Sequence, residues 1–465
     1  MTSARTIAAI AAGKLAGSVS RILRRGGGTA VAGLAALRVD PHVVHALAAQ
    51  AGAGAIAITG TNGKTTTSLM LSRIAAAAGL RPLHNRSGSN LMRGVAAMLV
   101  GEATLAGRIP DARRRVAILE VDEATLPEIV REGAPRVIVV TNLFRDQLDR
   151  YGEVDAVAQA WERGFAAAGG DTTMVLNADD PAVAHLGRGA RTRVIYYGID
   201  DTTAGSPEMD HASDFRTCLD CGGDLAYDVS YYGHIGHWRC TRCDNRRPQP
   251  DVRITRVTLG EDVTSLAIAI PDGTLNVRLP LAGLYNAYNA LAAVAGSLAL
   301  GLPRDAIVSA LEGFSAAFGR QERFQVGTRA VQVLLGKNPT GLNQVLHTVA
   351  ARPGPKHLLF FLNDGIADGR DVSWIWDTDY ETLQPQTASV LAAGTRAEDL
   401  ALRLKYAGYG SDIGVEHDTA AALRRAVAAT PEGGALYVLP TYTAMLEVRE
   451  LLAKNSGAAH FWEGA

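Results

Sequence analysis

The chain has 465 residues, of which 47% are hydrophobic and 20% are charged, and its formal net charge is −1. This length exceeds what one hydrophobic core usually supports, so we expect two or three domains. The balanced charge provides no overall field for attracting nucleic acid or anionic lipid, so either partner would need a local patch. No apolar run reaches the length of about 18 residues that a membrane-spanning helix needs.

The first segment, "RTIAAIAAGKLAGSVSRILRR", predicts an amphipathic helix. Its lysine and its arginine cluster argue against an export signal and favour a cytoplasmic protein. Two interpretations stay open for this helix: packing on its own protein, or contact of the basic end with the inner face of the membrane. A glycine-rich break at residues 24–33 and a short helix at 41–50 complete the expected N-terminal helical extension, residues 1–52.

From Ala55 onward, apolar β-rich runs alternate with helical stretches, which is typical of a parallel sheet covered by helices. The runs are "AIAITG", "VAILEVDE", "RVIVVTN", "TTMVLNADD" and "RVIYYG". Three later runs, "VRITRVTL", "TSLAIAI" and "TLNVRL", predict antiparallel strands, and helices are expected at 285–300 and 303–314. We therefore expect an α/β central domain over residues 53–322.

A second α/β series begins near Val331 with "AVQVLLG", "HLLFFLND", "SVLAAG" and "ALYVLP". It follows a linker, "FGRQERFQVG", and predicts a Rossmann-like C-terminal domain over residues 323–465.

The segment "ITGTNGKTTTS", residues 58–68, has the features of a phosphate-binding loop between a strand and a helix. Backbone N–H groups at the helix start would face the anion, and Lys64 would add positive charge. Thr65 is positioned to offer its hydroxyl to Mg²⁺. Glu120 ends a strand of the same sheet, where a carboxylate can face the same ligand. The alternative is a structural glycine turn with an incidental lysine.

All four cysteines of the chain occur in two C-x₂-C pairs inside an expected insertion, residues 214–247. Their spacing predicts a closed, structural zinc site. Two disulfides or unmetallated thiols are the alternatives. The ligands would be Cys218, Cys221, Cys240 and Cys243.

The stretch "FFLNDGIADGRDVSWIWDTDYE" places a group of aspartates beyond a strand of the second series, where α/β active sites lie. The alternative is a solvated acidic loop with tryptophans packed beneath it. Asp364, Asp368 and Asp377 are the candidates that we consider for function.

The shortened loop "TGTNGKTTT" resembles that of the Mur ligases and folylpolyglutamate synthases. "LEVDEA", "TNLFRDQLDRYG", "LNADDP", "GLYNAYNALAA" and "FGRQER" resemble further family motifs in the expected order. The resemblance implies a Mur ligase-type fold and an ATP-dependent enzyme that activates a carboxylate as an acyl phosphate for attack by an amine. It implies Mg²⁺ ligation by Thr65 and Glu120, adenine contacts from Asn286 and Asn289, and a nucleotide contact from Arg320. The phosphate loop would comprise Gly60, Thr61, Asn62, Gly63, Lys64, Thr65 and Thr66.

Three features depart from the larger Mur ligases. The residues before the loop are too few for a domain that binds UDP, so a UDP-linked substrate is not expected. The family's histidine in the "TNLFRDQLD" segment is Gln147 here, and there is no lysine between Lys64 and Lys337 that could be carbamylated.

Three segments resemble the MurT branch, the synthetase subunits of lipid II isoglutaminyl synthases. They are the aspartate-rich stretch "FFLNDGIADGRDVSWIWDTDYE" and the segments "LLGKNPTGLNQ" and "AGTRAEDLALRLKYAG". This resemblance implies amidation of the α-carboxyl of D-glutamate in lipid II, with ammonia from a GatD-like glutamine amidotransferase in a heterodimer. One C-terminal aspartate would complete the partner's Cys–His pair. We select Asp377, which ends "SWIWD", while Asp364 and Asp368 stay open.

Two other functions are considered. A stand-alone amino-acid ligase of the folylpolyglutamate synthase type would need no partner protein. A nucleic-acid-binding zinc protein would need a basic ribbon, but residues 214–247 hold five arginines and five aspartates.

Overall fold

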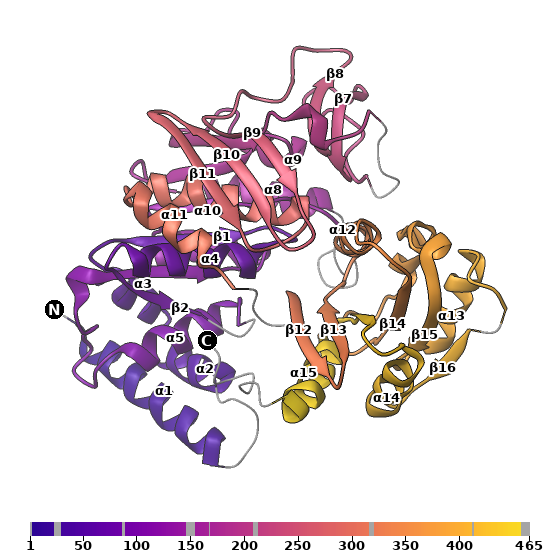
Figure 1. Ribbon diagram of the computed structural model, residues 1–465. Coiled ribbons are helices and arrows are strands. Elements are labelled where there is room, and N and C mark those ends of the chain that lie inside the picture. Colours follow the sequence, from indigo (N-terminus) through magenta and orange to yellow (C-terminus); the bar gives the residue numbers. More distant parts are fainter. Residues whose placement is uncertain are drawn as a thin grey trace.

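The computed structural model describes residues 2–22, 29–85, 89–145, 154–166, 168–207, 213–315, 320–411 and 413–456. These residues form a nine-stranded sheet, a six-stranded sheet and a two-stranded ribbon, with helices on both faces of the two large sheets (Figure 1). The fold is therefore α/β, as predicted. Among the described residues, no helix combines the length and the apolar character needed to cross a membrane.

The N-terminal residues form three helices, α1 (Ala4–Ile22), α2 (Thr29–Val39) and α3 (Val43–Ala48). The expected break over residues 24–33 is wrong at its end, because α2 begins at Thr29. Gly33 lies inside α2, and a Cβ atom there would collide with the carbonyl of Arg93 on α5 (Met92–Glu102). This glycine permits close helix packing.

The central sheet has the strand order β11-β10-β9-β6-β5-β4-β1-β3-β2, with β1 (Ala55–Thr59) among the inner strands. The strands from β2 to β6 pair in parallel with their neighbours, and β10 and β11 extend the sheet in antiparallel pairing. The antiparallel prediction is confirmed for β10 and β11 but only in part for β9, which pairs antiparallel to β10 and parallel to β6. The other strands are β2 (Arg81–His84), β3 (Arg115–Glu120), β4 (Val137–Val140), β5 (Thr173–Asn177), β6 (Arg193–Ile199), β9 (Val252–Leu259), β10 (Thr264–Ile270) and β11 (Gly273–Leu279).

Both faces of the central sheet are buried, which explains the continuous apolar runs of its parallel strands. Ile56 and Ile58 face a core shared with α4 and α10, whereas Ala55 and Ala57 face the N-terminal helices. The covering helices are α4 (Lys64–Ala77), α10 (Leu284–Ala299) and α11 (Arg304–Glu312) on one face, and α1, α3, α5, α6 (Leu126–Gly133), α8 (Val154–Ala166) and α9 (Pro181–His185) on the other.

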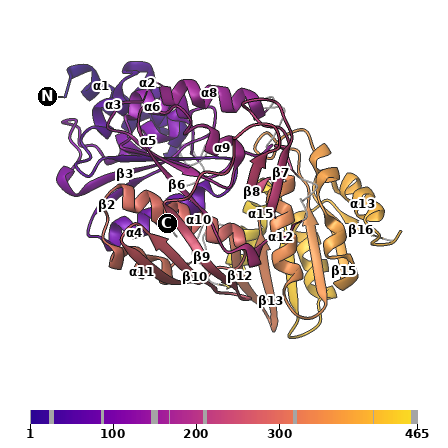
Figure 2. The same ribbon diagram turned by 90° about the horizontal axis from the view of Figure 1, so that it is seen from above.

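The C-terminal sheet has the order β12-β13-β17-β14-β15-β16, and only β12 pairs antiparallel to its neighbour. Its strands are β12 (Arg320–Val326), β13 (Arg329–Leu334), β14 (Lys356–Phe361), β15 (Thr387–Ala393), β16 (Gly414–Glu416) and β17 (Ala435–Leu439). The helices are α12 (Pro339–Ala350), α13 (Ala397–Tyr406), α14 (Thr419–Ala429) and α15 (Tyr442–Ser456). Seen from above, α12 lies between this sheet and the central domain (Figure 2).

The cysteine-bearing insertion leaves the central sheet after β6 and returns at β9. It contains the two-stranded ribbon, β7 (Leu225–Tyr232) and β8 (Ile235–Cys240), which pair antiparallel. Trp238 of β8 is buried, and its indole N–H donates to the carbonyl of Ala178 at 3.0 Å. The ribbon is thereby attached to the end of β5.

Candidate functional site

The phosphate loop connects β1 to α4, as the sequence predicted. Gly60 and Gly63 have φ values of 124° and 89°, in the region that favours glycine. A Cβ atom on Gly60 would collide with Thr141, and one on Gly63 would collide with the side-chain amide of Asn289. Both glycines are therefore needed for the loop's conformation and for its close neighbours.

Lys64, the first residue of α4, is buried at the centre of this loop. Its Nζ donates to the Gly60 carbonyl at 2.5 Å and to Glu123 Oε1 at 2.8 Å. The carbonyl of Glu123 accepts from the Trp161 indole N–H at 2.9 Å. Sequence reasoning missed Glu123, although it lies in the same "EVDE" run as Glu120.

Thr65 and Glu120 meet as expected for two ligands of one cation. The Thr65 hydroxyl donates to Glu120 Oε1 at 2.8 Å. Asn85 holds the end of β3 by bonding both the N–H and the carbonyl of Glu120, at 2.8 and 2.7 Å. A hydroxyl and a carboxylate, with the buried carboxylate of Asp122 nearby, form the oxygen-rich donor set that Mg²⁺ prefers.

The two residues that follow β4 hold the phosphate loop from its other side. Asn142 Oδ1 accepts from the Asn62 N–H at 2.8 Å, and the Thr141 hydroxyl donates to the Asn62 carbonyl at 2.8 Å. The Thr61 hydroxyl accepts from the N–H of Phe144 at 2.9 Å. The "TN" of the "TNLFRDQLDRYG" segment thus stabilises the loop backbone. Gln147 lies in the range 146–153, outside the described residues.

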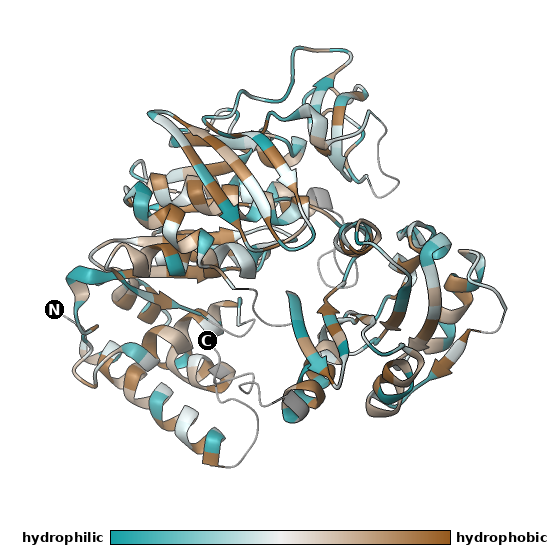
Figure 3. Ribbon diagram, in the orientation of Figure 1, coloured by the Kyte–Doolittle hydropathy of each residue, from teal (hydrophilic) through white to brown (hydrophobic). Residues whose placement is uncertain are grey.

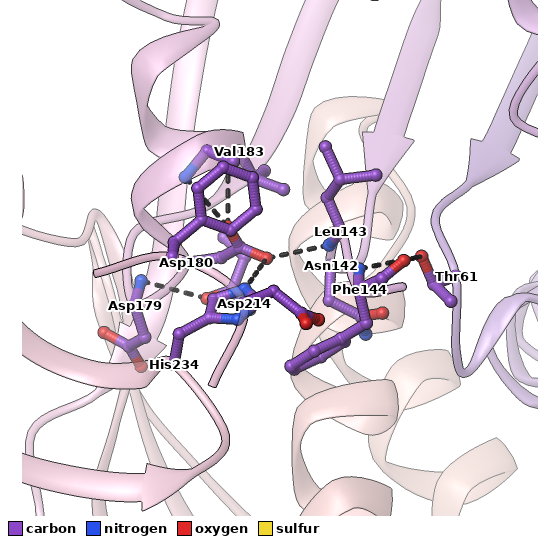
Figure 4. A network of polar contacts seen from close by, with 12 residues as sticks. Thr61, Asn142, Leu143, Phe144, Asp179, Asp180, Val183, Asp214 and His234 are labelled. Atoms are coloured by element: carbon purple, nitrogen blue, oxygen red, sulfur yellow. Dashed lines mark hydrogen bonds and ion pairs between the residues drawn. The ribbon is translucent and has the colours of Figure 1, made fainter. Parts of the chain in front are cut away.

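A buried network joins this segment to the ribbon (Figure 4). Asp180 accepts from the N–H of Leu143 at 2.8 Å and caps α9 through Ala182 and Val183. His234, in the hairpin between β7 and β8, is fully buried, and its Nε2 lies 3.4 Å from Asp180 Oδ2. Its ring packs on that of Phe144, with centroids 4.3 Å apart. The ribbon therefore contacts the segment that supports Thr61, a link that sequence reasoning missed.

A cavity of about 440 Å³ opens beside the phosphate loop, at the junction with the C-terminal domain. Asn286 and Asn289 line it from the first two turns of α10 and are joined by a hydrogen bond of 3.3 Å. Lys337 and Gln344 line it from the C-terminal domain. Arg320 begins β12, and its side chain lies outside the described part of the structure.

One contact links the phosphate loop directly to α12. Asn338 caps this helix by accepting from the Gly341 N–H at 2.8 Å, and its Nδ2 donates to Asn62 Oδ1 at 3.0 Å. The C-terminal domain thus touches the phosphate loop through a residue at the N-terminus of α12.

The four cysteines come together, and all their sulfur atoms lie within 4.8 Å of one another. The Sγ atoms of Cys218 and Cys243 are 3.7 Å apart, and those of Cys221 and Cys240 are 3.5 Å apart. These separations approach the edge of about 3.8 Å in a tetrahedron with 2.3 Å zinc–sulfur bonds.

Hydrogen-bond donors surround the cysteine cluster. Asn245 Nδ2 donates to Cys218 Sγ at 3.3 Å, and the backbone N–H of Gly223 lowers the pKa of the Cys221 thiol to about 6. Donors of this kind stabilise thiolates, the form that binds metal. The residues therefore fit a tetrahedral zinc ion.

The three candidate aspartates of the C-terminal domain lie in different surroundings. Asp368 is buried and accepts from the N–H and the hydroxyl of Thr443 at 2.8 and 2.5 Å, so it caps the start of α15. Asp364 is more accessible and contacts Thr395 and Arg396. Asp377 is half exposed and lies 3.7 Å from the guanidinium of Arg145 in the central domain.

Comparison with known proteins agrees with this geometry. The Mur ligase middle domain model matches residues 58–235, and the MurT ligase C-terminal model matches residues 335–445. The fold is similar to the structure of a pseudomurein peptide ligase type C from Methanothermus fervidus, with a TM-score of 0.66 and 22% identity. The aligned region covers 86% of this chain and 78% of the chain of that ligase. The structure of MurF from Acinetobacter baumannii aligns with a TM-score of 0.64 and 20% identity, over 89% of this chain and 80% of the MurF chain. Fold and phosphate loop together define a Mur ligase-type enzyme.

Two relatives specify the branch. The chain is 34% identical over 449 residues to the MurT subunit of the glutamine-hydrolyzing lipid II isoglutaminyl synthase of Staphylococcus aureus (strain N315), covering 96% of this chain and 98% of the relative. It is 33% identical over 450 residues to the MurT subunit from Streptococcus pneumoniae (strain ATCC BAA-255 / R6), covering 95% of this chain and 97% of the relative. The chain belongs to the MurT family and is a ligase.

Proposed function

We propose that this enzyme converts the D-glutamate of the lipid II stem peptide to D-isoglutamine by amidating its α-carboxyl group. ATP activates the carboxylate as an acyl phosphate, and ammonia displaces the phosphate. One observation carries the proposal: the cavity of about 440 Å³ brings the phosphate loop and Glu120 against the C-terminal domain. The names of the relatives support lipid II as the substrate.

In this proposal, the backbone from Gly60 to Thr66 and Lys64 bind the β- and γ-phosphates of ATP. Lys64 then exchanges its bond to Glu123 for the phosphate oxygens, where its charge stabilises the transferring phosphoryl group. Thr65 and Glu120 hold Mg²⁺, which neutralises negative charge on the phosphates when bound. Asn286 and Asn289 face the adenine from α10.

Two further roles come from the domain junction and from the cysteine cluster. Arg320 contacts the nucleotide from the start of β12, and closure of α12 on the loop through Asn338 and Asn62 excludes water from the acyl phosphate. Zinc bound by the four cysteines stabilises the ribbon and takes no part in the chemistry.

We propose that the ammonia comes from a GatD-like glutamine amidotransferase bound in a heterodimer. The chain has four cysteines and all lie in the cluster, so zinc binding leaves none as a nucleophile for glutamine. Asp377 completes the partner's Cys–His pair, with Asp364 as the other accessible candidate. The capping role of Asp368 favours a structural assignment for that residue. The enzyme acts in the cytoplasm, at the inner face of the membrane.

The test is a lipid II amidation assay with Mg·ATP, comparing ammonium with glutamine, for the chain alone and for the chain with the amidotransferase. We expect product from ammonium with the chain alone, and from glutamine only with both proteins. ATP consumption only on addition of an amino acid, with no amidated lipid II, would contradict the proposal and favour a stand-alone amino-acid ligase.

A further inference from the structure

The N-terminal hairpin, defined as α1 with α2, exposes the side of α1 that an ordinary surface helix would bury. The side of α1 that faces the protein consists mostly of small or polar residues. These buried residues are Thr6, Ala9, Ile10, Gly13, Gly17 and Ser20. Ile10 is the one large aliphatic side chain in this group, whereas Leu15, Val19 and Ile22 of the same helix are exposed.

The small residues are needed for close packing of α1 on its neighbours. A Cβ atom at Gly13 would lie 2.9 Å from Val100 Cγ1 on α5, 3.0 Å from the carbonyl of Ala32 and 3.2 Å from Ala36 Cβ on α2. Packing of the hairpin onto α5 therefore uses the small face, and Leu15, Val19 and Ile22 stay exposed.

The exposed aliphatic side chains are large and close together along α1. Leu15 is 68% exposed, Val19 46% and Ile22 80%, at positions that share one side of a helix. Val31 and Leu34 on α2 are also exposed. Figures 2 and 3 show the hairpin at the periphery of the molecule, with hydrophobic residues along α1. Exposed large aliphatic side chains grouped on one hairpin indicate a partner.

The charge of the hairpin indicates which partner. The described residues 2–22 and 29–39 contain four basic side chains and no acidic one, although the whole chain has a net charge of −1. The basic residues are Arg5, Lys14, Arg21 and Arg38. Arg5 Nε donates to the Val39 carbonyl at 2.7 Å and Lys14 Nζ to the Gly101 carbonyl at 2.9 Å, so these two charges are held against the protein. A hairpin with an exposed apolar side and an excess of basic side chains is complementary to an anionic phospholipid surface.

The hairpin also borders the cavity beside the phosphate loop. Ala30 of α2 and Arg93 of α5 line this cavity, and Gly33 of α2 packs directly on the backbone of Arg93. The hairpin that would contact the membrane therefore also contributes Ala30 to the wall of the cavity.

We propose that the aliphatic face of the N-terminal hairpin docks on an anionic phospholipid bilayer and inserts Leu15, Val19 and Ile22 into its interface. The inference rests on the proposed function for the reason why the enzyme visits a membrane. Its evidence, the exposed face and the basic side chains, is independent of that function.

The test is flotation of the full chain with vesicles of phosphatidylglycerol and phosphatidylcholine, and with vesicles of phosphatidylcholine alone. We expect binding to the anionic vesicles, weakened by high salt, and at least a tenfold lower partition for the double variant Leu15→Ser/Val19→Ser. Leu259→Ser is the matched control, because this leucine of β9 is 49% exposed and lies outside the hairpin. The same variants are assayed for amidation of lipid II in vesicles and of a water-soluble short-chain analogue.

Selective loss of activity on the vesicle-borne substrate by the double variant would support the proposal. Equal binding of the double variant and the wild type would overturn it, as would absence of wild-type binding. A concentration-dependent dimer that the double variant abolishes would assign the face to a second copy of the chain and also overturn it. If the wild type amidates neither substrate, the proposed function fails, and vesicle binding alone still decides the docking surface.

Discussion

The phosphate loop and the acidic loop of the C-terminal domain follow inner strands of their sheets, β1 and β14, but their charged groups are held differently. Lys64 and Glu123 form a buried ion pair in which each side chain is 8% exposed. Asp364 and Asp377 are 36% and 49% exposed, and their ion pairs are longer, at 3.4 and 3.7 Å. The first loop is a site that the chain preorganises alone, whereas the second presents carboxylates that another molecule can reach.

Asp368 shows that position in the acidic loop does not determine its character. This carboxylate is buried and bonded to Thr443, like the groups of the phosphate loop. Substitutions in the buried groups should therefore have larger effects than substitutions in the accessible ones.

Replacing Lys64 removes the central charge of the preorganised loop. We expect Lys64→Ala to lower amidation with ammonium by about 10³-fold or more, because a positioned cation for the transferring phosphoryl group is lost. The variant also leaves Glu123 buried without this partner, which costs about 3–5 kcal/mol of stability. Steady-state kinetics and urea unfolding measure the two effects.

The double variant Lys64→Ala/Glu123→Gln distinguishes chemistry from stability. We expect it to recover most of the stability and none of the activity. Lys454→Ala, a change to an exposed lysine on α15, serves as the control. Activity near that of the wild type in either Lys64 variant would contradict the assignment.

Loss of zinc tests whether the ribbon supports the phosphate loop. Cys240→Ser should abolish zinc binding and cost several kcal/mol of stability, because the ribbon has only a small core of its own. It should also weaken ATP binding, since His234 of the ribbon packs on Phe144. Metal analysis, thermal unfolding and nucleotide titration check these outcomes. Thr241→Ser, beside the same ligand, should leave all three unchanged, and unaltered ATP affinity in the zinc-free variant would show that the ribbon and loop are independent.

The exposed aspartates are tested by comparing two nitrogen sources. Asp377→Ala should lower glutamine-dependent amidation by about 10²-fold, the scale of a lost acid–base contribution, while ammonium-dependent amidation stays unchanged. The fold should tolerate the change, because an exposed ion pair such as that with Arg145 contributes only about 0–1 kcal/mol. Asp364→Ala and Asp371→Ala are measured in parallel. If Asp364→Ala selectively lowers glutamine-dependent amidation instead, Asp364 rather than Asp377 completes the partner's Cys–His pair.

Asp368 and Asp371 should differ in the pH dependence of stability. Burial raises the pKa of Asp368 above its usual value, so its folded-state pKa exceeds the unfolded one. The contribution of Asp368 to the free energy of unfolding is therefore fully present below the unfolded-state pKa. It falls as the pH rises through the folded-state pKa. The stability of the wild type relative to Asp368→Asn should decrease as the pH rises above about 4, the ordinary pKa of an aspartate.

For Asp371 the expected change of stability with pH has the opposite sign. The backbone N–H of Ser373 lowers the pKa of this exposed carboxyl, so its contribution is present above the unfolded pKa and is lost as the pH falls. Urea unfolding of the wild type and of both Asn variants from about pH 2 to pH 7 checks both slopes, because the contribution of Asp371 is lost only below the ordinary aspartate pKa of about 3.9. Parallel slopes for the two variants would contradict the difference in burial.

Much of the fold was predictable because local patterns carry it. Continuous apolar runs predicted the doubly covered parallel strands, and "GTNGKTT" after such a run predicted the loop between β1 and α4. The cysteine spacing predicted the cluster, because two C-x₂-C pairs on a hairpin bring four sulfurs together. The glycine-rich break was misread over residues 29–33, since Gly33 serves close packing on α5, which only the tertiary structure reveals.

The sequence by itself determined which strands are buried and where a phosphate can be held, because side-chain periodicity and glycine conformations act over a few residues. The tertiary structure alone decided that Glu123 pairs with Lys64, that His234 reaches Phe144 across about 90 residues of chain, and that Asp368 is a helix cap while Asp377 stays accessible. It also decided that α1 buries Ile10 and turns Leu15, Val19 and Ile22 outward. These outcomes depend on which segments, distant in the sequence, pack against one another in the interior. Local sequence patterns carry no information about such long-range packing.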